Sequence, residues 1–164
     1  MDVDAAPGGI MQKSGATDAT QELAMTAEEL ASFLDDVFPQ RHTNWPPIHI
    51  ESLEPYNAQL RMEFSEAEIR PGGTISGPAM FRLADFGFYV CLLSMIGPVQ
   101  LAVTTNMSIN FLRRPAPKDL IAKIRILKLG RRLAVGDVFL FSDGSTDAVA
   151  HATGTYSIPS PEKR

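Results

Sequence analysis

The chain has 164 residues, with 45% hydrophobic residues, a net charge of −4 and one cysteine. This length suits one domain with a buried core, and a single cysteine excludes an internal disulfide. The polar N-terminus lacks the apolar stretch of a secretory signal, and the apolar run 86–97 is too short to cross a bilayer. We therefore expect a cytoplasmic protein with no membrane partner.

Charge is distributed unevenly along the chain. Residues 1–69 hold 13 acids and 3 bases, whereas residues 113–132 hold eight bases and one acid. The basic stretch is typical either of solvated strand ends or of a site for an anionic ligand, such as a phosphate-bearing cofactor. Nucleic acid is not an expected partner, because the overall charge is acidic and aromatic residues do not alternate with the basic ones.

The first folded segment is predicted at residue 26, after a flexible tail over residues 1–25. Thr26 and Glu29 form a capping box, and apolar residues at helical spacing predict a helix over 27–37. Two strands, 49–53 and 58–64, follow it and are joined by a turn.

A long helix is predicted after the glycine-rich loop 70–74. It begins at Ser76 or Gly77, carries Pro78 in its first turn, and ends at Gly97. Its residues are apolar on nearly every face, so other elements have to enclose it. Asp85 is its only carboxylate, and an enclosed carboxylate is costly unless it is paired or used.

Four further strands complete the predicted fold, over residues 103–112, 120–129, 133–141 and 148–158. In the first of them, strict alternation places Thr104 on a polar face opposite Met107 and Ile109. Tight turns between successive strands predict an antiparallel sheet. The fold class is α+β, with one sheet curved around one helix in a single domain over 26–158 and a short tail over 159–164.

Several common sites are absent from the sequence. The three histidines are far apart and lack partners at ligand spacing, so no metal site is expected. The glycine-rich loop lacks the ending of a nucleotide-binding loop, and Ser76 lacks the glycine of a nucleophile elbow. Cys91 lies on the apolar helix and is interpreted as a core residue.

Asp85 and the start of its helix remain as the candidate site. The helix N-terminus offers free backbone amides, and the absence of a side chain at Gly77 lets a carbonyl oxygen approach its N–H. Asp85 lies eight residues further on, about 12 Å along the axis. Two such helices, antiparallel across a two-fold axis, would bring Asp85 of one copy toward Gly77 of the other, which requires a homodimer.

The segments 76–85 (SGPAMFRLAD) and 102–116 (AVTTNMSINFLRRPA) resemble the hotdog-fold acyl-CoA thioesterases, nearest the phenylacetyl-CoA thioesterase-like branch. The segments 129–134 and 150–156 fit as well, so the resemblance covers about residues 45–158. It implies a sheet wrapped around a central helix, with Asp85 as general base or nucleophile. It also implies that the Gly77 amide polarises the thioester carbonyl and that the Thr104 hydroxyl orients water or the carboxylate.

The resemblance further implies an active site at a dimer interface, commonly within a tetramer of two dimers. Acyl-CoA would be the substrate, with coenzyme A as part of it and no separate cofactor. The substrate-binding candidates are Arg70, Ser76, Phe81, Arg113, Arg114, Arg131 and Arg132, the last four as partners for the CoA phosphates.

The chain departs from the family pattern at two positions. Ser76-Gly77-Pro78 stands where the family has His-Gly-Gly, and Arg70 stands where an amide side chain is usual. Arg70 could donate to the oxyanion or to a CoA phosphate, or it could pair with Asp85 and suppress its reactivity.

Other interpretations stay open at this point. Asp85 could be a structural carboxylate paired with Arg82, three residues before it. The protein could bind acyl-CoA without hydrolysing it, which the arginine at position 70 would favour. A dehydratase on the same fold is a third hypothesis, but such enzymes pair a histidine with a carboxylate, and this helix has no histidine.

Overall fold

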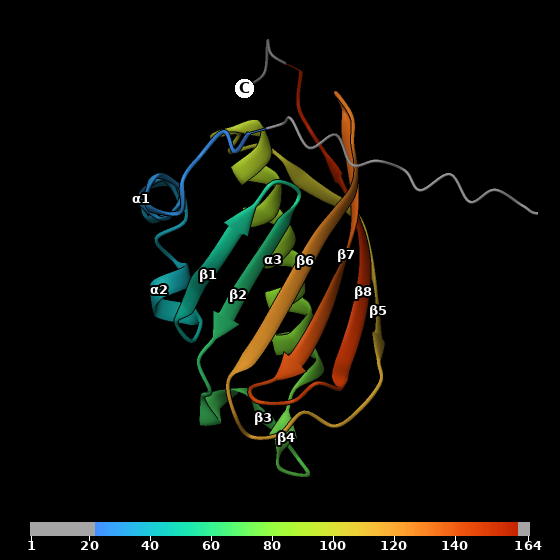
Figure 1. Cartoon of the computed structure of the whole chain (residues 1–164). Coiled ribbons are helices and arrows are strands. Elements are labelled where there is room, and N and C mark those ends of the chain that lie inside the picture. Colours follow the sequence, from blue (N-terminus) through green and yellow to red (C-terminus); the bar gives the residue numbers. More distant parts are fainter. Residues whose placement is uncertain (1–21, 161–164) are drawn as a thin grey trace, which may run out of the picture.

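The computed structural model describes residues 22–160 (Figure 1). Its helices and strands follow in the order α1 (Ala27–Val37), α2 (Arg41–Asn44), β1 (Ile48–Glu54), β2 (Asn57–Met62), the 3₁₀ turn η1 (Glu66–Glu68), β3 (Ile69–Arg70), β4 (Thr74–Ile75), α3 (Gly77–Ile96), β5 (Val103–Phe111), β6 (Leu120–Leu129), β7 (Leu133–Ser142) and β8 (Ala148–Ser157). The predicted long helix and all six predicted long strands are therefore present. The short helix α2 and the two-residue strands β3 and β4 were not predicted.

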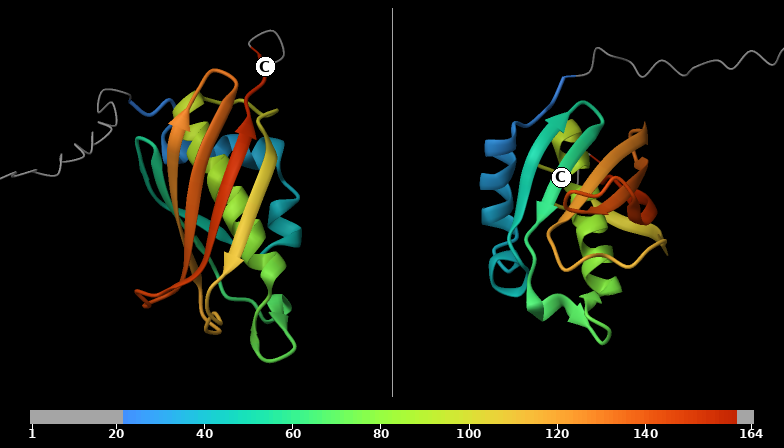
Figure 2. Two further views of the ribbon diagram at one scale, coloured as in Figure 1. Left: turned by 90° about the vertical axis from the view of Figure 1, so that its right-hand side faces the viewer. Right: turned by 60° about the horizontal axis from the view of Figure 1, so that its bottom comes forward.

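Six strands form one antiparallel sheet in the order β1-β2-β6-β7-β8-β5. The sheet curves around α3, and α1 lies on the outer side of α3 beside β1 (Figure 2). The chain crosses from α3 to the far edge of the sheet, so β5 pairs with β8 alone, and β1 is the other edge. This is the predicted α+β arrangement of the hotdog fold.

The start of the described chain packs against the core. The Ala24 and Met25 amides both donate to the Ser94 carbonyl near the end of α3, and Met25 is buried. The capping box then forms as predicted, with the Thr26 hydroxyl accepting from the Glu29 amide and the Glu29 carboxylate accepting from the Thr26 amide. Packing thus extends two residues ahead of the predicted boundary at residue 26, and residues 1–21 and 161–164 of the predicted tails lie outside the described part.

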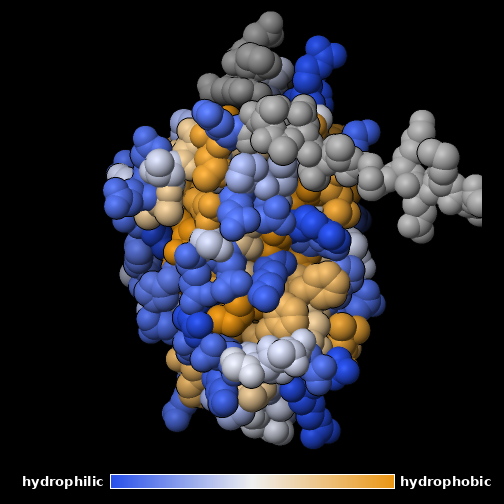
Figure 3. Space-filling model, viewed as in Figure 1, coloured by the Kyte–Doolittle hydropathy of each residue, from blue (hydrophilic) through white to orange (hydrophobic). Residues whose placement is uncertain are grey.

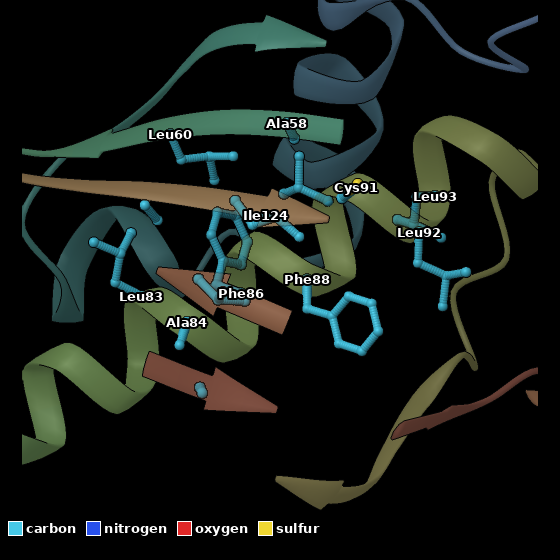
Figure 4. Close-up of a cluster of buried hydrophobic side chains, with 14 of the residues drawn as sticks. Ala58, Leu60, Leu83, Ala84, Phe86, Phe88, Cys91, Leu92, Leu93 and Ile124 are labelled. Atoms are coloured by element: carbon cyan, nitrogen blue, oxygen red, sulfur yellow. The ribbon is translucent and has the colours of Figure 1, made fainter. Parts of the chain in front are cut away.

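The helix α3 contributes more buried residues to the core than any other element. The helix begins at Gly77, one of the two predicted starts, with Pro78 in its first turn and Gly97 at its end as predicted, and Ser76 is its N-cap. The close-up in Figure 4 shows Phe86 of α3 beside Ile124 of β6, while the Phe88 ring points away from Ile124. By length and composition α3 could span a membrane, but most of it is buried inside this fold.

Phe88 of α3 packs closely against the sheet. Gly136 of β7 and Gly154 of β8 are register partners, and the Phe88 ring lies against both. A Cβ at Gly136 would lie 2.8 Å from the ring and 2.5 Å from the Arg125 carbonyl oxygen. The two glycines therefore let a fully buried aromatic ring sit directly on the sheet.

The strict alternation predicted for β5 is wrong at its start. The β5–β8 register shifts between Thr104 and Asn106, which makes Thr105 an extra, bulged residue. Thr104 consequently faces α3 together with Met107 and Ile109, which pack against the core. The bulge thus turns Thr104 from the predicted outer face to the inner one.

Apolar side chains also reach the surface. Hydrophilic residues cover much of the face seen in Figure 3, but apolar patches interrupt them. The large exposed apolar residues around β5 are Leu101, Val103, Phe111 and Leu112, each more than half exposed. They gather at an edge strand, whose outer backbone groups pair with no strand of the described part of the chain.

Candidate active site

Asp85 lines an open pocket of 540 Å³ on the side of α3 that the sheet leaves uncovered. The pocket walls come from α1, α3 and the segment that leads into β5, and they are mainly aromatic and aliphatic. Its lining residues are Val37, Phe38, Trp45, Arg82, Asp85, Phe86, Tyr89, Gln100, Leu101, Ala102, Val103, Thr104 and Tyr156. A single carboxylate in such a setting is the arrangement expected for a group that acts on a bound ligand.

Two hydroxyl groups hold the Asp85 carboxylate. The Thr104 hydroxyl donates to Asp85 Oδ1 over 2.6 Å, and the Tyr156 hydroxyl lies 2.7 Å from the same oxygen and 2.9 Å from the Asp85 backbone carbonyl. No hydrogen bond within residues 22–160 reaches Oδ2. The predicted association of Asp85 with Thr104 is present in the geometry, and Oδ2 remains available to a water molecule or a substrate.

No cation pairs with Asp85 in the described chain. Arg82, the partner considered from the sequence, instead makes a two-pronged ion pair with Glu68 at 2.6 and 3.2 Å and lies over the Trp45 ring. Arg70 donates to the Pro71 carbonyl and does not reach Asp85. A structural ion pair therefore does not account for Asp85.

The amides at the start of α3 differ in their partners. Ala79 donates to the Ser76 hydroxyl, Met80 donates to the Ser76 carbonyl, and Pro78 has no N–H. The Gly77 N–H has no partner among residues 22–160. This free donor at the positive end of a 20-residue helix is suited to bind a carbonyl oxygen that gains negative charge.

The surroundings of Gly77 explain why the position lacks a side chain. A Cβ there would lie 3.1 Å from the Phe111 ring. Ser76, which was predicted to bind substrate, serves as the N-cap, and its hydroxyl is occupied by the Ala79 amide. Phe81 is 37% exposed and does not line the Asp85 pocket.

The four candidate arginines separate into two pairs. Arg113 and Arg114 follow β5 and line a second pocket of 510 Å³ together with Arg70, Gly77 and Phe111. Arg131 and Arg132 lie in the β6–β7 turn, at the opposite end of the sheet beside the start of β5. The predicted basic cluster is therefore not one site within a single copy of the chain.

Burial determines the ionisation of the groups around Asp85. Burial raises the pKa of the Tyr156 phenol, and the adjacent Asp85 carboxylate raises it further, so the hydroxyl keeps its proton and acts as a donor.

Burial raises the pKa of the Cys91 thiol to about 12, which leaves it an inert core residue. Within residues 22–160, no three His, Cys, Asp or Glu side chains gather to hold a metal ion.

Tyr156 is the functional contact that the sequence interpretation missed. It lies directly opposite Thr104 in the β5–β8 register, at the end of an inward-facing row of small residues that includes Ala152 and Gly154. A buried aromatic residue with a polar head at the end of such a row is a signal that could have been noticed, since buried tyrosine hydroxyls usually find a partner.

The comparisons with known proteins identify the family of the chain. Residues 72–149 match the family model described as the thioesterase superfamily. The chain is 30% identical over 116 residues to a Saccharolobus solfataricus protein named "putative esterase", and the match spans 70% of this chain and 75% of that protein.

Solved structures give the same result. A protein of Silicibacter sp., described as a "putative thioesterase", is 45% identical, with a TM-score of 0.76 over 85% of this chain and 95% of its own. A variant of the phenylacetic acid degradation protein PaaI from Thermus thermophilus shares the fold at 24% identity, with a TM-score of 0.64 over 74% of this chain and 99% of its own. A Streptococcus mutans protein solved with acetyl-CoA does so at 24% identity, with a TM-score of 0.62 over 70% of this chain and 90% of its own. With its antiparallel sheet around one central helix, the chain belongs to the thioesterase superfamily and has the hotdog fold, and this family supports the hydrolysis of a thioester.

Proposed function

We propose that the chain hydrolyses acyl-CoA thioesters to the free acid and coenzyme A at sites shared between two copies of itself. The observation that carries the proposal is the Asp85 carboxylate, which lines a pocket and, within residues 22–160, has no cationic partner and one oxygen that accepts no hydrogen bond. The acetyl-CoA found with the Streptococcus mutans protein supports the choice of substrate.

In this mechanism Asp85 Oδ2 takes a proton from a water molecule as that water attacks the thioester carbonyl. In the alternative route Oδ2 attacks the carbonyl itself, and the acyl–Asp85 anhydride that forms as the C–S bond breaks is then hydrolysed by water to the free acid. The Gly77 amide of the partner subunit donates to the carbonyl oxygen as it becomes negative. Collapse of the tetrahedral intermediate breaks the C–S bond, and coenzyme A leaves as a thiolate that takes up a proton. Thr104 keeps the carboxylate oriented through the cycle.

A shared site follows from distances along α3. Gly77 and Asp85 of one copy are about 12 Å apart along the helix axis, too far to act on one carbonyl group. The exposed apolar residues at the β5 edge favour pairing of β5 with its counterpart in a second copy. Antiparallel pairing would bring the Asp85 pocket of one copy beside the Gly77 pocket of the other.

The same pairing gives the arginines a role. It would place Arg131 and Arg132 of one copy near the partner's Arg113, Arg114 and Arg70, so both groups could contact CoA phosphates. A dimer of such dimers, as the family resemblance implies, would contain two of these assemblies.

The test is the release of free thiol from short, medium, long and aryl acyl-CoA esters by the wild-type protein and the Asp85→Asn variant. We expect turnover by the wild type and a loss of at least about 100-fold in the variant, which removes the base but keeps the shape of the side chain. Wild-type turnover by Asp85→Asn would overturn the mechanism. Tight CoA binding in calorimetry without thiol release by either protein would favour a binding protein that does not hydrolyse its ligand.

A further inference from the structure

Tyr156 extends from β8 to Asp85 on α3. Its ring is buried at 3% exposure, meets the Phe88 ring edge-on at 4.9 Å and stacks on Tyr89 at 6.3 Å. Both rings contact the buried Tyr156 ring, so packing sets the position of the hydroxyl. The hydroxyl is then held where it meets α3 at Asp85.

The hydroxyl touches two atoms of the same residue. It is 2.7 Å from Asp85 Oδ1 and 2.9 Å from the Asp85 backbone carbonyl oxygen. A phenol has a single proton, so it donates to these two acceptors in a shared bond. Bridging a side-chain oxygen and the backbone of one residue restricts the rotation of the carboxylate relative to its own helix.

Thr104 and Tyr156 act on the same oxygen because of the β5–β8 register. The two residues are directly opposite each other on neighbouring strands, and both hydroxyls converge on Oδ1. Hydrogen bonds to an ionised group are stronger than neutral ones. Two such bonds to Oδ1 and none to Oδ2 within the described chain make the two carboxylate oxygens inequivalent.

We propose that Tyr156 is a positioning residue, which acts with Thr104 to hold Asp85 Oδ1 so that Oδ2 alone is presented to the reacting water or thioester. This inference rests on the proposed function, because it assigns Tyr156 a role through Asp85. It goes beyond that function because it assigns different roles to the two carboxylate oxygens: Oδ1 accepts the two hydroxyl hydrogen bonds, and Oδ2 reacts. Tyr156 itself does not contact the substrate in this scheme.

The test compares Tyr156→Phe with wild-type protein. The variant keeps the ring and its packing and removes only the hydroxyl. We expect kcat to fall about 10- to 100-fold while KM changes by less than about twofold, since the loss affects the orientation of the base and not the pocket walls.

The matched control is Tyr56→Phe. It removes a tyrosine hydroxyl from the β1–β2 turn, where the backbone amide of Tyr56 contacts Met95 near the end of α3, well away from Asp85. We expect its kcat to equal that of the wild type. Thermal unfolding of each variant is measured as well, and turnover is assayed well below the midpoint of each.

The possible outcomes separate the two proposals. Loss of turnover in Asp85→Asn with an unchanged kcat in Tyr156→Phe overturns the role of Tyr156 and leaves the proposed function standing. A rise in KM that is as large as the fall in kcat also overturns that role, because it indicates a damaged pocket. A crystal structure of Tyr156→Phe gives a readout without activity: we expect a displaced or doubly oriented Asp85 carboxylate, and an unmoved one contradicts the inference. Wild-type turnover in Asp85→Asn instead removes the proposed function on which the inference rests.

Discussion

Arg82 lies one turn before Asp85 on α3, yet its guanidinium pairs with Glu68 and not with Asp85. Glu68 is mostly buried, with 13% of its side chain exposed, and it holds Arg82 beside the Trp45 ring. An arginine three residues before a carboxylate on a helix can otherwise pair with it. Glu68 thus keeps the positive charge of Arg82 away from the candidate base.

Replacing Glu68 by Gln should remove the ion pair between Glu68 and Arg82. Arg82 can then pair with Asp85, and we expect kcat to fall about 2- to 5-fold, because such a pair is worth a few tenths to 1 kcal/mol. Steady-state thiol release measures the effect. Glu66→Gln, an exposed change in the same 3₁₀ turn, is the control, and equal kcat in both variants would contradict the prediction.

The role of the Gly77 amide can be tested with two substitutions that crowd Phe111 in a similar way. Gly77→Pro removes the N–H, and proline is well tolerated at this first helical position because Ser76 before it is already extended. Gly77→Ala adds a Cβ but keeps the N–H. We expect kcat of the proline variant to be about 10²- to 10³-fold below that of the alanine variant, as for loss of one oxyanion donor. Similar kcat values in the two variants would show that the amide is not the donor.

A shared site predicts complementation between inactive variants. Asp85→Asn and Gly77→Pro homodimers are mixed and allowed to exchange subunits. Half of the dimers become mixed, and each mixed dimer has one site with a native Asp85 and a native Gly77, so about a quarter of wild-type turnover should return. No recovery, with subunit exchange verified by mass spectrometry, would place both groups in one copy.

The packing of Phe88 on β7 predicts that one added methyl group lowers the free energy of unfolding substantially. In Gly136→Ala the new Cβ meets the Arg125 carbonyl and the Phe88 ring, so we expect a loss of about 1–3 kcal/mol in the free energy of unfolding. Denaturant unfolding measures it. Val135→Ala, an outward-facing neighbour, should cost less than about 1 kcal/mol.

The pH dependence of stability should contain a contribution from Asp119. The Phe64 amide donates to this carboxylate and Arg61 pairs with it, so its pKa lies below the ordinary value of 3.8. The stabilisation is therefore fully present above pH 3.8 and is lost as the pH falls from there through the folded-state pKa. Asp119→Asn should be less stable than the wild type at pH 7 and should lose less stability between pH 6 and pH 3. Parallel stability curves for the two proteins would contradict this assignment.

Much of the fold could be predicted from local patterns. The capping box at Thr26, the N-cap at Ser76 and the end at Gly97 depend on backbone groups a few residues away, so the sequence specifies them directly. Residues 122–126 of β6 alternate between buried and exposed side chains, because one face of that strand packs against α3.

Predictions that depended on uninterrupted alternation were less accurate. The bulge at Thr105 adds one residue to β5, which reverses the side on which Thr104 lies. Nothing in the alternating pattern of this strand indicated it, because a bulge is stabilised by the neighbouring strand and by the core beneath it. The meeting of Thr104 and Tyr156 at Asp85 depends on that reversal.

The sequence by itself determined helices α1 and α3 and the six long strands, the single carboxylate of the central helix, and the resemblance to the thioesterases. These features depend on residue identity and on short-range spacing. Only the tertiary structure decided that β5 lies at the edge beside β8, that Arg82 is held by Glu68, and that the arginines separate to opposite ends of the sheet. Strand order and side-chain partners are set by packing between segments far apart in the chain, and no local pattern encodes them.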